Sequence, residues 1–138
     1  MEFEVAKQKA IRYLILAKKT EYEVRNKLKK SEYSNDIIDQ VIEYLLKIKY
    51  IDDNEYVDAY IRQCKSLLNY SIYEIKQKLL QKGIKKCIID EKLEKLKETN
   101  YEKELIEKLI NGKCKAMEEL KLKQYLYRRG LSRNFLKD

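Results

Sequence analysis

Proline is absent from the sequence, and glycine occurs only three times. Because sandwiches and barrels need many turn residues, this scarcity argues against an all-β fold. Histidine is also absent, which removes Ser-His-Asp and Cys-His catalysis and the usual zinc sites. Gly83, Gly112 and Gly130 lie too far apart to form a phosphate-cradling loop. We therefore expect a protein that is not an enzyme and that needs neither a cofactor nor a metal.

Cysteine and long apolar stretches are scarce as well. Cys64, Cys87 and Cys114 form no Cys-x-x-Cys pair, and three cysteines cannot all pair within one chain. We expect reduced thiols that fill the core of a cytoplasmic protein. No apolar stretch approaches the roughly 20 residues of a membrane-spanning helix, so we expect no membrane partner.

Positive charge is present in excess. The 31 lysines and arginines outnumber the 23 aspartates and glutamates, which gives a net charge of +8. This balance favours a polyanionic or acidic partner. A lysine-rich surface that is simply solvated explains the same numbers, so charge alone does not choose between the two.

Apolar residues recur at intervals of three and four throughout the chain, which is the period of an α-helix. The sequence therefore predicts an all-α protein. Thr20 and Ser71 are predicted to cap helices, since each is followed by a glutamate three residues later. Asp52 and Asp53 offer N-cap oxygens to the next helix, and Gly83 suits the left-handed residue just after a helix.

Two segments of the chain match each other at a fixed offset. Glu23 and Glu74 are 51 positions apart, and the same offset relates the apolar and acidic residues that follow them. A period near 50 is typical of a helical repeat array. A third unit is shorter, and in it Arg129-Gly130-Leu131 repeats the Lys82-Gly83-Ile84 turn. We predict three tandem three-helix repeats, residues 1–51, 52–98 and 99–138, stacked into an elongated, curved body whose last repeat is truncated.

Three motifs follow one another along the chain. Residues 10–28 contain AIRYL and then TEYEVRNKL, residues 50–56 read YIDDNEY, and residues 124–131 read QYLYRRGL. They are similar to A-x-x-x-L…S-x-x-E-L-x-x-K-L, G-Y-L-D-D-x-x-F and F-L-x-x-R-G-F/Y of the RecX family, the regulators of the RecA recombinase. Lys49 and Ser71 stand where that family commonly has glycine. The resemblance covers nearly the whole chain, with the motifs in the family's order.

This resemblance to RecX implies a function as well as a fold. It implies three three-helix repeats that bind along the RecA filament on single-stranded DNA, bridge neighbouring protomers, and slow ATP hydrolysis and strand exchange. It also implies that the protein is not itself an enzyme. The expected partners are the RecA filament and, weakly, single-stranded DNA, reached directly or through RecA, and we expect a monomer.

A basic surface of the middle repeat is the predicted contact surface. Lys78 and Lys82 lie four residues apart on one helix face, and arginines offer forked recognition of carboxylate or phosphate. Tyr70 and Tyr73 fall off the apolar stripe, as candidates for interface anchors or for base stacking. The predicted contacts to the RecA filament or DNA are Arg62, Lys65, Tyr70, Tyr73, Lys76, Lys78, Lys82, Lys85, Lys86, Arg128 and Arg129. The alternative is that these lysines are merely solvated.

Other polar and aromatic residues have structural explanations. Tyr13, Tyr44, Tyr56 and Tyr60 fall on apolar stripes and are predicted to belong to the core. Asp52 and Asp53 could be mistaken for paired catalytic carboxylates, but adjacent residues at a helix start point in different directions, so capping explains them more simply. The predicted caps and turns are Thr20, Asp52, Asp53, Ser71, Gly83 and Gly130.

Two other functions remain open. A three-helix unit resembles a helix-turn-helix, so the chain can also be interpreted as a non-specific, basic helical DNA-binding protein. Against this, the candidate recognition helix at residues 34–48 carries Asp36, Asp39 and Glu43, which would face phosphates poorly. The other possibility is a small scaffold for an unrelated partner. Direct DNA binding would weaken steeply as the salt concentration rises.

Overall fold

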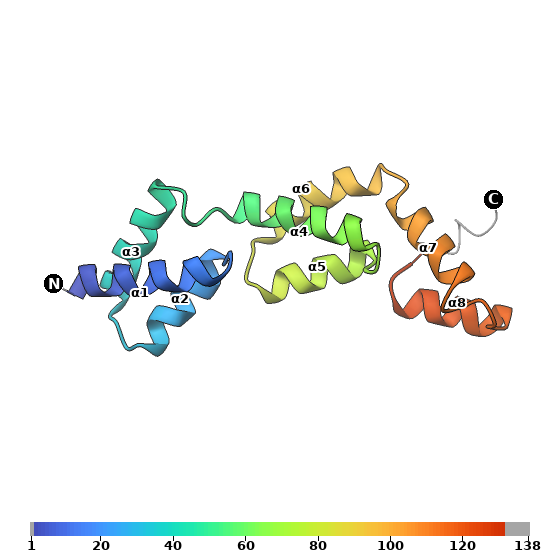
Figure 1. Cartoon of the computed structure of the whole chain (residues 1–138), viewed down its shortest axis with the longest axis horizontal. Coiled ribbons are helices and arrows are strands. Elements are labelled where there is room, and N and C mark those ends of the chain that lie inside the picture. Colours follow the sequence, from blue (N-terminus) through green and yellow to red (C-terminus); the bar gives the residue numbers. More distant parts are fainter. Residues whose placement is uncertain (1, 132–138) are drawn as a thin grey trace.

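The computed structural model describes residues 2–131 and is all-helical over that range, as the periodicity predicts (Figure 1). Within residues 2–131, eight helices follow one another without a strand between them. They are α1 (Glu2–Leu16), α2 (Glu21–Lys30), α3 (Asn35–Lys47), α4 (Asp53–Leu67), α5 (Ile72–Gln81), α6 (Lys86–Lys97), α7 (Tyr101–Asn111) and α8 (Glu119–Arg128).

The helices form three groups along the long axis of an elongated body (Figure 1). We call α1–α3 unit one, α4–α6 unit two, and α7 and α8 unit three. The predicted boundaries at 51/52 and 98/99 lie in the connections before α4 and before α7, and they stay predictions. The third helix expected after Ser132 lies outside the described residues.

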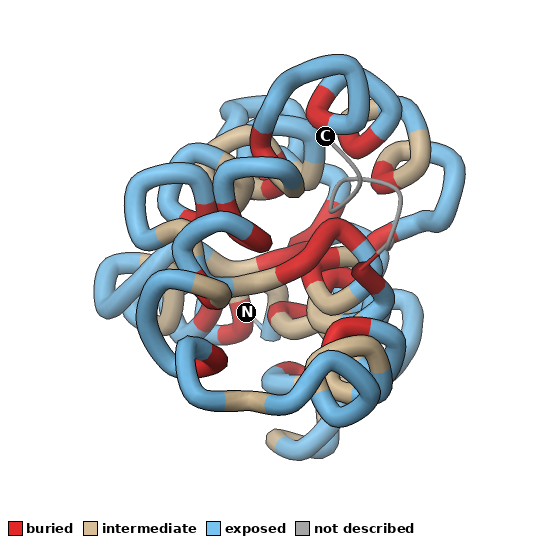
Figure 2. The backbone as a smooth tube through the Cα atoms, turned by 90° about the vertical axis from the view of Figure 1, so that its right-hand side faces the viewer, coloured by how far each residue is buried: buried red, intermediate tan, exposed pale blue. Residues whose placement is uncertain are grey.

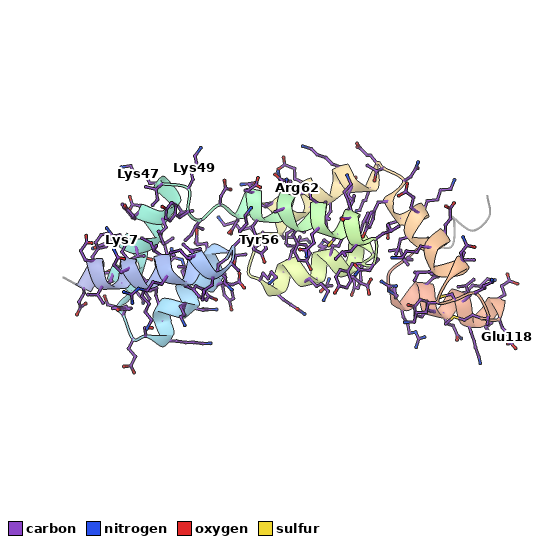
Figure 3. All side chains as sticks on the ribbon, in the orientation of Figure 1. Lys7, Lys47, Lys49, Tyr56, Arg62 and Glu118 are labelled. Atoms are coloured by element: carbon purple, nitrogen blue, oxygen red, sulfur yellow. The ribbon has the colours of Figure 1, made fainter. Side chains whose placement is uncertain are left out.

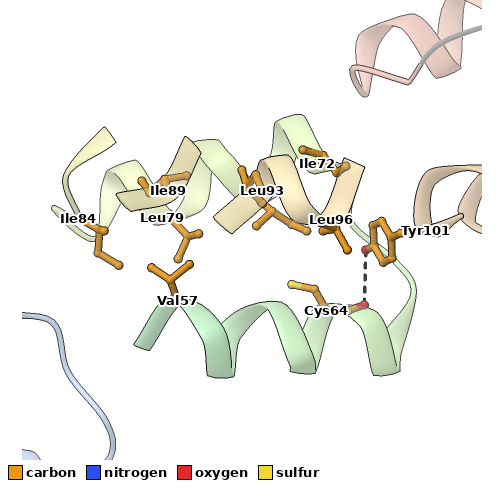
Figure 4. Close-up of a cluster of buried hydrophobic side chains, with 10 residues drawn as sticks. Val57, Cys64, Ile72, Leu79, Ile84, Ile89, Leu93, Leu96 and Tyr101 are labelled. Carbon is orange, nitrogen blue, oxygen red and sulfur yellow. Dashed lines mark hydrogen bonds between the residues drawn. The ribbon is translucent and has the colours of Figure 1, made fainter. Parts of the chain in front are cut away.

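Each unit has its own main cluster of buried apolar side chains, and the cluster of unit two also takes in Tyr101 of α7. Unit one buries Leu28, Ile42 and Leu45, among others, and unit two buries Leu79 and Ile89 (Figure 4). Viewed along the body, the buried positions lie on the inner sides of the helices and the exposed positions form the rim (Figure 2). Burial of these faces supplies the main driving force for folding.

Two residues predicted to be in the core, Cys87 and Tyr44, are on the surface instead. Cys87 is exposed, whereas Cys64 and Cys114 are buried as expected. Tyr44 is exposed, while Tyr13 and the two tyrosines of α4 are partly buried. Tyr44 lies near the edge of the apolar stripe of α3, where a small rotation of the helix decides exposure, whereas Cys87 lies on the face of α6 opposite the buried Ile89 and Leu96. Burial raises the pKa of the Cys64 thiol to about 11, so this group stays protonated and acts as packing.

The predicted helix caps are present, with one difference. Thr20 and Ser71 each complete a capping box with the glutamate three residues later. Asp52 caps α4 by accepting the Glu55 N–H at 3.1 Å. Asp53, however, caps no part of its own helix: its carboxylate accepts an N–H from unit one. The prediction that Asp53 caps its own helix was therefore wrong. The N–H that its carboxylate accepts belongs to Glu21, which is 32 residues away in the chain.

Units one and two meet at what we call the first joint. The buried Thr20 hydroxyl donates to the carbonyl of Lys82 at 2.7 Å, and the Glu21 N–H donates to the Asp53 carboxylate at 3.0 Å. The ring of Tyr22 lies on Gly83, so a Cβ at that glycine would come within 2.2 Å of the ring. With φ at +80°, Gly83 is also in the left-handed region that favours glycine.

Units two and three meet at the second joint, which repeats the same contacts. The Ser71 hydroxyl donates to the carbonyl of Arg129, and the Ile72 N–H donates to the Glu102 carboxylate at 3.4 Å. Tyr73 lies on Gly130, whose φ is +79°. The sequence repeat therefore encodes a repeated joint between units as well as a repeated unit.

Candidate functional site

A basic groove runs between α4 and α6 on unit two. Four cationic side chains line it: Arg62 and Lys65 come from α4, and Lys92 and Lys95 come from α6. Asp58 is its one carboxylate, and Ile61, Leu96 and Thr99 complete the lining. The groove has a volume of about 320 Å³. We refer to this feature as the basic groove.

Two of the four cations are already neutralised within the unit. Lys92 lies 3.0 Å from the Asp58 carboxylate and is largely covered, and Arg62 lies 3.0 Å from Glu55 while staying mostly exposed. Within residues 2–131, Lys65 and Lys95 are exposed and have no ion-pair partner. These two lysines are therefore the charges that an anionic partner can neutralise at least cost.

The basic groove contains residues that the sequence analysis missed. Lys92 and Lys95 lie three positions apart on α6, so they share one face of that helix. This spacing can be read from the sequence. The predicted contact surface, however, was based on the closely spaced lysines between positions 76 and 86, most of which lie on or next to α5. In the view of Figure 3, the labelled Arg62, Lys47 and Lys49 lie along the upper side of the body.

The lysines predicted on α5 are held by contacts within the protein. Lys76 lies 2.9 Å from Asp90 of α6. Lys78 lies over the ring of Tyr70, with its Nζ 4.6 Å from the ring centre. Lys82 lies 3.8 Å from Glu23 across the first joint. The predicted contact residues therefore fall into two groups. Arg62 and Lys65 line the basic groove, whereas these three lysines contact side chains within the protein.

The remaining predicted contacts also separate. Lys85 and Lys86 are exposed where α6 begins, and Arg128 is exposed at the end of α8. Arg129 is different, because its guanidinium bonds both oxygens of Glu74 and the carbonyl of Asn69. These contacts make Arg129 part of the second joint and withdraw most of its hydrogen-bonding capacity from any partner.

The two tyrosines predicted as anchors have different environments. Tyr70 packs partly buried against the core of unit two, and its carbonyl accepts the hydroxyl of Tyr101. Tyr73 is 54% exposed, although its Cβ supports Gly130. Of the pair, Tyr73 keeps a ring that a partner can contact.

The Glu74–Arg129 pair is the strongest electrostatic feature of the second joint. Burial alone raises the pKa of Glu74, but hydrogen bonds from Arg129 and from the Ser71 backbone outweigh it, and the net pKa lies below the ordinary value. The hydrogen bond to Glu74 correspondingly raises the pKa of Arg129. The pair is therefore charged under ordinary conditions and fixes the end of α8 against α5.

Among residues 2–131 there is no group of three acidic or cysteine side chains that could hold a metal ion. No helix in this range is long and apolar enough to cross a membrane. The basic groove offers ammonium and guanidinium donors, which suit phosphate or carboxylate groups of a partner.

Comparison with known proteins gives a consistent result. The sequence model for the first three-helix domain of RecX matches residues 6–45, and the model for the second matches residues 52–93. The regulatory protein RecX of Clostridium acetobutylicum is 36% identical over 137 residues, which cover 92% of this chain and 63% of that protein. The RecX of Bacillus cereus strain Q1 is 34% identical, and the match covers 98% of this chain and 52% of the relative.

Solved structures agree with these sequence matches. The crystal structure of RecX from Lactobacillus salivarius superposes with a TM-score of 0.82 at 26% identity, covering 99% of this chain and 92% of that one. A second crystal structure of a regulatory protein RecX gives a TM-score of 0.80 at 26% identity, covering 99% of this chain and 70% of that one. The chain spans less than two thirds of the length of the curated relatives named above.

Proposed function

Since the chain belongs to the RecX family of regulatory proteins, we propose that it regulates the RecA recombinase. In this proposal it binds along the RecA filament on single-stranded DNA and suppresses ATP hydrolysis and strand exchange. It acts as a monomer in the cytoplasm and carries out no chemistry of its own. The observation that carries the proposal is the match of both RecX three-helix domains, in order, to residues 6–93.

The shape and charge of the body support binding to a filament. A row of units exposes a long surface for its size, so several modest contacts can act together. The basic groove lies on the middle unit and provides Lys65 and Lys95 as exposed cations. A RecA–DNA filament offers two kinds of anion, acidic side chains and DNA phosphates, and both fit such donors.

The direct test is RecA ATP hydrolysis on single-stranded DNA, titrated with this protein. Inhibition at well below one protein per RecA supports regulation of the filament, because simple competition for DNA needs far more protein. A parallel DNA-binding measurement without RecA serves as the control. If inhibition is absent, or occurs only when the protein coats the DNA, the proposal is refuted.

A matched pair of variants tests the basic groove. Lys65→Gln with Lys95→Gln removes the two exposed cations, and we expect the inhibiting concentration to rise roughly tenfold, the effect of about 1.4 kcal/mol. Lys103→Gln with Lys121→Gln removes the same charge from exposed sites on α7 and α8 and is expected to change it less than threefold. Equal effects of the two pairs would mean that net charge matters and the basic groove does not.

The basic groove also suits a second function, which is non-specific binding to DNA. If phosphate contacts supply the affinity, binding to DNA without RecA should fall by orders of magnitude between low and moderate salt. Inhibition of RecA that persists across the same salt range favours the filament, since contacts other than phosphate neutralisation then carry the affinity. The basic-groove variants should lower both activities if one surface serves both.

A further inference from the structure

The two joints share a design but differ in what surrounds it. In the second joint, Tyr101 of α7 is buried in the apolar cluster of unit two (Figure 4), and its hydroxyl donates to the carbonyl of Tyr70. Leu68 packs against the clusters of both units. Lys108 of α7 donates to the carbonyls of Leu67 and Leu68 at 3.1 and 3.0 Å. Units two and three are therefore joined through shared core as well as through polar contacts.

The first joint lacks these additions. The buried cluster of unit one consists of residues between Ala6 and Ile51, with no member from α4–α6. An open groove of about 290 Å³ separates the units, with Leu46 and Ile51 on one side and Lys85 and Ile88 on the other. The contacts that remain across the described joint are mainly hydrogen bonds, ion pairs and the stacking of Tyr22 on Gly83.

The side chains that precede Gly83 and Gly130 also bind more weakly at the first joint than at the second. Arg129 reaches both carboxylate oxygens of Glu74, at 2.7 Å for the closest approach. At the equivalent place in the first joint, Lys82 lies 3.8 Å from one oxygen of Glu23. A forked guanidinium fixes both distance and direction, whereas an ammonium at this separation fixes neither.

We propose that the first joint is the hinge of this protein. Units two and three move as one body, and unit one swings against them as the Thr20–Lys82 and Glu21–Asp53 hydrogen bonds open. Thr20, Asp53 and Lys82 are positioning residues that set the angle of unit one. The hinge does not depend on the proposed function, but it would let a body of fixed length adjust to a partner with a repeating lattice.

Two backbone amides report the state of the joints directly. Glu21 and Ile72 are the first residues of α2 and α5, so their N–H groups have no acceptor within the helix. Each instead donates to a carboxylate of the following unit, Asp53 or Glu102. Protection of these amides from hydrogen exchange therefore measures how often each joint opens.

The experiment is amide hydrogen exchange of the full chain, followed by NMR. We expect the Ile72 amide to be at least roughly tenfold more protected than the Glu21 amide. The static bond lengths, 3.4 Å and 3.0 Å, predict the opposite order. The Val24 amide, bonded within α2 to the Thr20 carbonyl, should exchange more slowly than Glu21. Equal protection of Glu21 and Ile72, or of Glu21 and Val24, would overturn the hinge.

A second variant tests the cause. Lys82→Arg keeps the charge and gives the first joint the side chain that Arg129 provides in the second. We expect protection of the Glu21 amide to rise about tenfold while the Val24 amide changes little. Lys78→Arg on the same helix is the control, because Lys78 faces Tyr70 within its own unit. No rise with Lys82→Arg, or an equal rise with Lys78→Arg, contradicts the proposal.

The two proposals of function and hinge fail in different ways. Loss of the expected exchange pattern refutes the hinge whatever the protein does to RecA. Absence of RecA inhibition together with the expected exchange pattern refutes the proposed function and leaves the hinge in place.

Discussion

Arg129→Ala is predicted to destabilise the protein, although the sequence suggested that Arg129 contacts the partner. The side chains of Arg129 and Glu74 are only 17% and 28% exposed, so truncation leaves the Glu74 carboxylate poorly solvated and without its partner. A fully buried pair broken in this way costs about 3–5 kcal/mol, and an exposed pair costs about 0–1 kcal/mol. The intermediate burial of this pair places the expected loss near 2 kcal/mol.

The adjacent Arg128 provides a matched control. Arg128 is exposed at the end of α8, so Arg128→Ala should change the free energy of unfolding by less than about 0.5 kcal/mol. Both variants remove one positive charge from neighbouring positions. Urea unfolding followed by far-UV circular dichroism measures the two free energies under identical conditions.

A double-mutant cycle identifies the origin of the loss. Combining Arg129→Ala with Glu74→Gln should cost about 1 kcal/mol less than the sum of the two single changes, because both remove the same interaction. If Arg129→Ala costs less than about 0.5 kcal/mol, or if Arg128→Ala costs as much, the assignment of Arg129 to the second joint is wrong. Loss of RecA inhibition in an Arg129 variant alone therefore does not identify a contact residue.

Three further changes test the fold. Gly83→Ala should lower the free energy of unfolding by well over about 1 kcal/mol, because alanine is strained at this φ and its Cβ meets the ring of Tyr22. Gly112→Ala should lower it less, since Gly112 has no positive φ and no such close contact, and thermal unfolding compares the two variants. Leu79→Ala removes a fully buried side chain and should cost about 2–5 kcal/mol, but Leu120→Ala, on an exposed residue, should cost close to none in urea unfolding. Folding lowers the pKa of Glu74 from its ordinary value of 4.5, so the ionised carboxylate stabilises the fold above that pH, and this stabilisation is lost as the pH falls through the lower folded pKa. The difference in free energy of unfolding between the natural sequence and Glu74→Gln, measured by urea unfolding, should therefore shrink in acid.

The helices and their caps followed from the sequence because they depend on neighbours within four residues. Thr20 and Ser71 were predicted as N-caps from the glutamates three positions later, and both capping boxes are present. Gly83 and Gly130 were predicted at the ends of helices, and both have a positive φ. The all-α fold and the 51-residue repeat have the same local origin.

The way the predicted contact residues group on the surface does not follow from the sequence, because it depends on angles between helices. Lysine density in the sequence pointed to α5, where Lys76 and Lys82 are held in ion pairs with other helices. The basic groove between α4 and α6 instead combines Lys65 with Lys95, which are 30 positions apart. No spacing rule within one helix connects those two residues.

The sequence by itself determined the helical class, the repeat and the residues that begin and end the helices, since short-range hydrogen bonds and apolar periodicity encode all three. Only the tertiary structure decided the long-range partners. The Thr20 hydroxyl meets a carbonyl 62 residues away, and Arg129 meets a carboxylate 55 residues away. Those contacts form where one unit meets the next and joins residues that are far apart in the sequence, which no local pattern records.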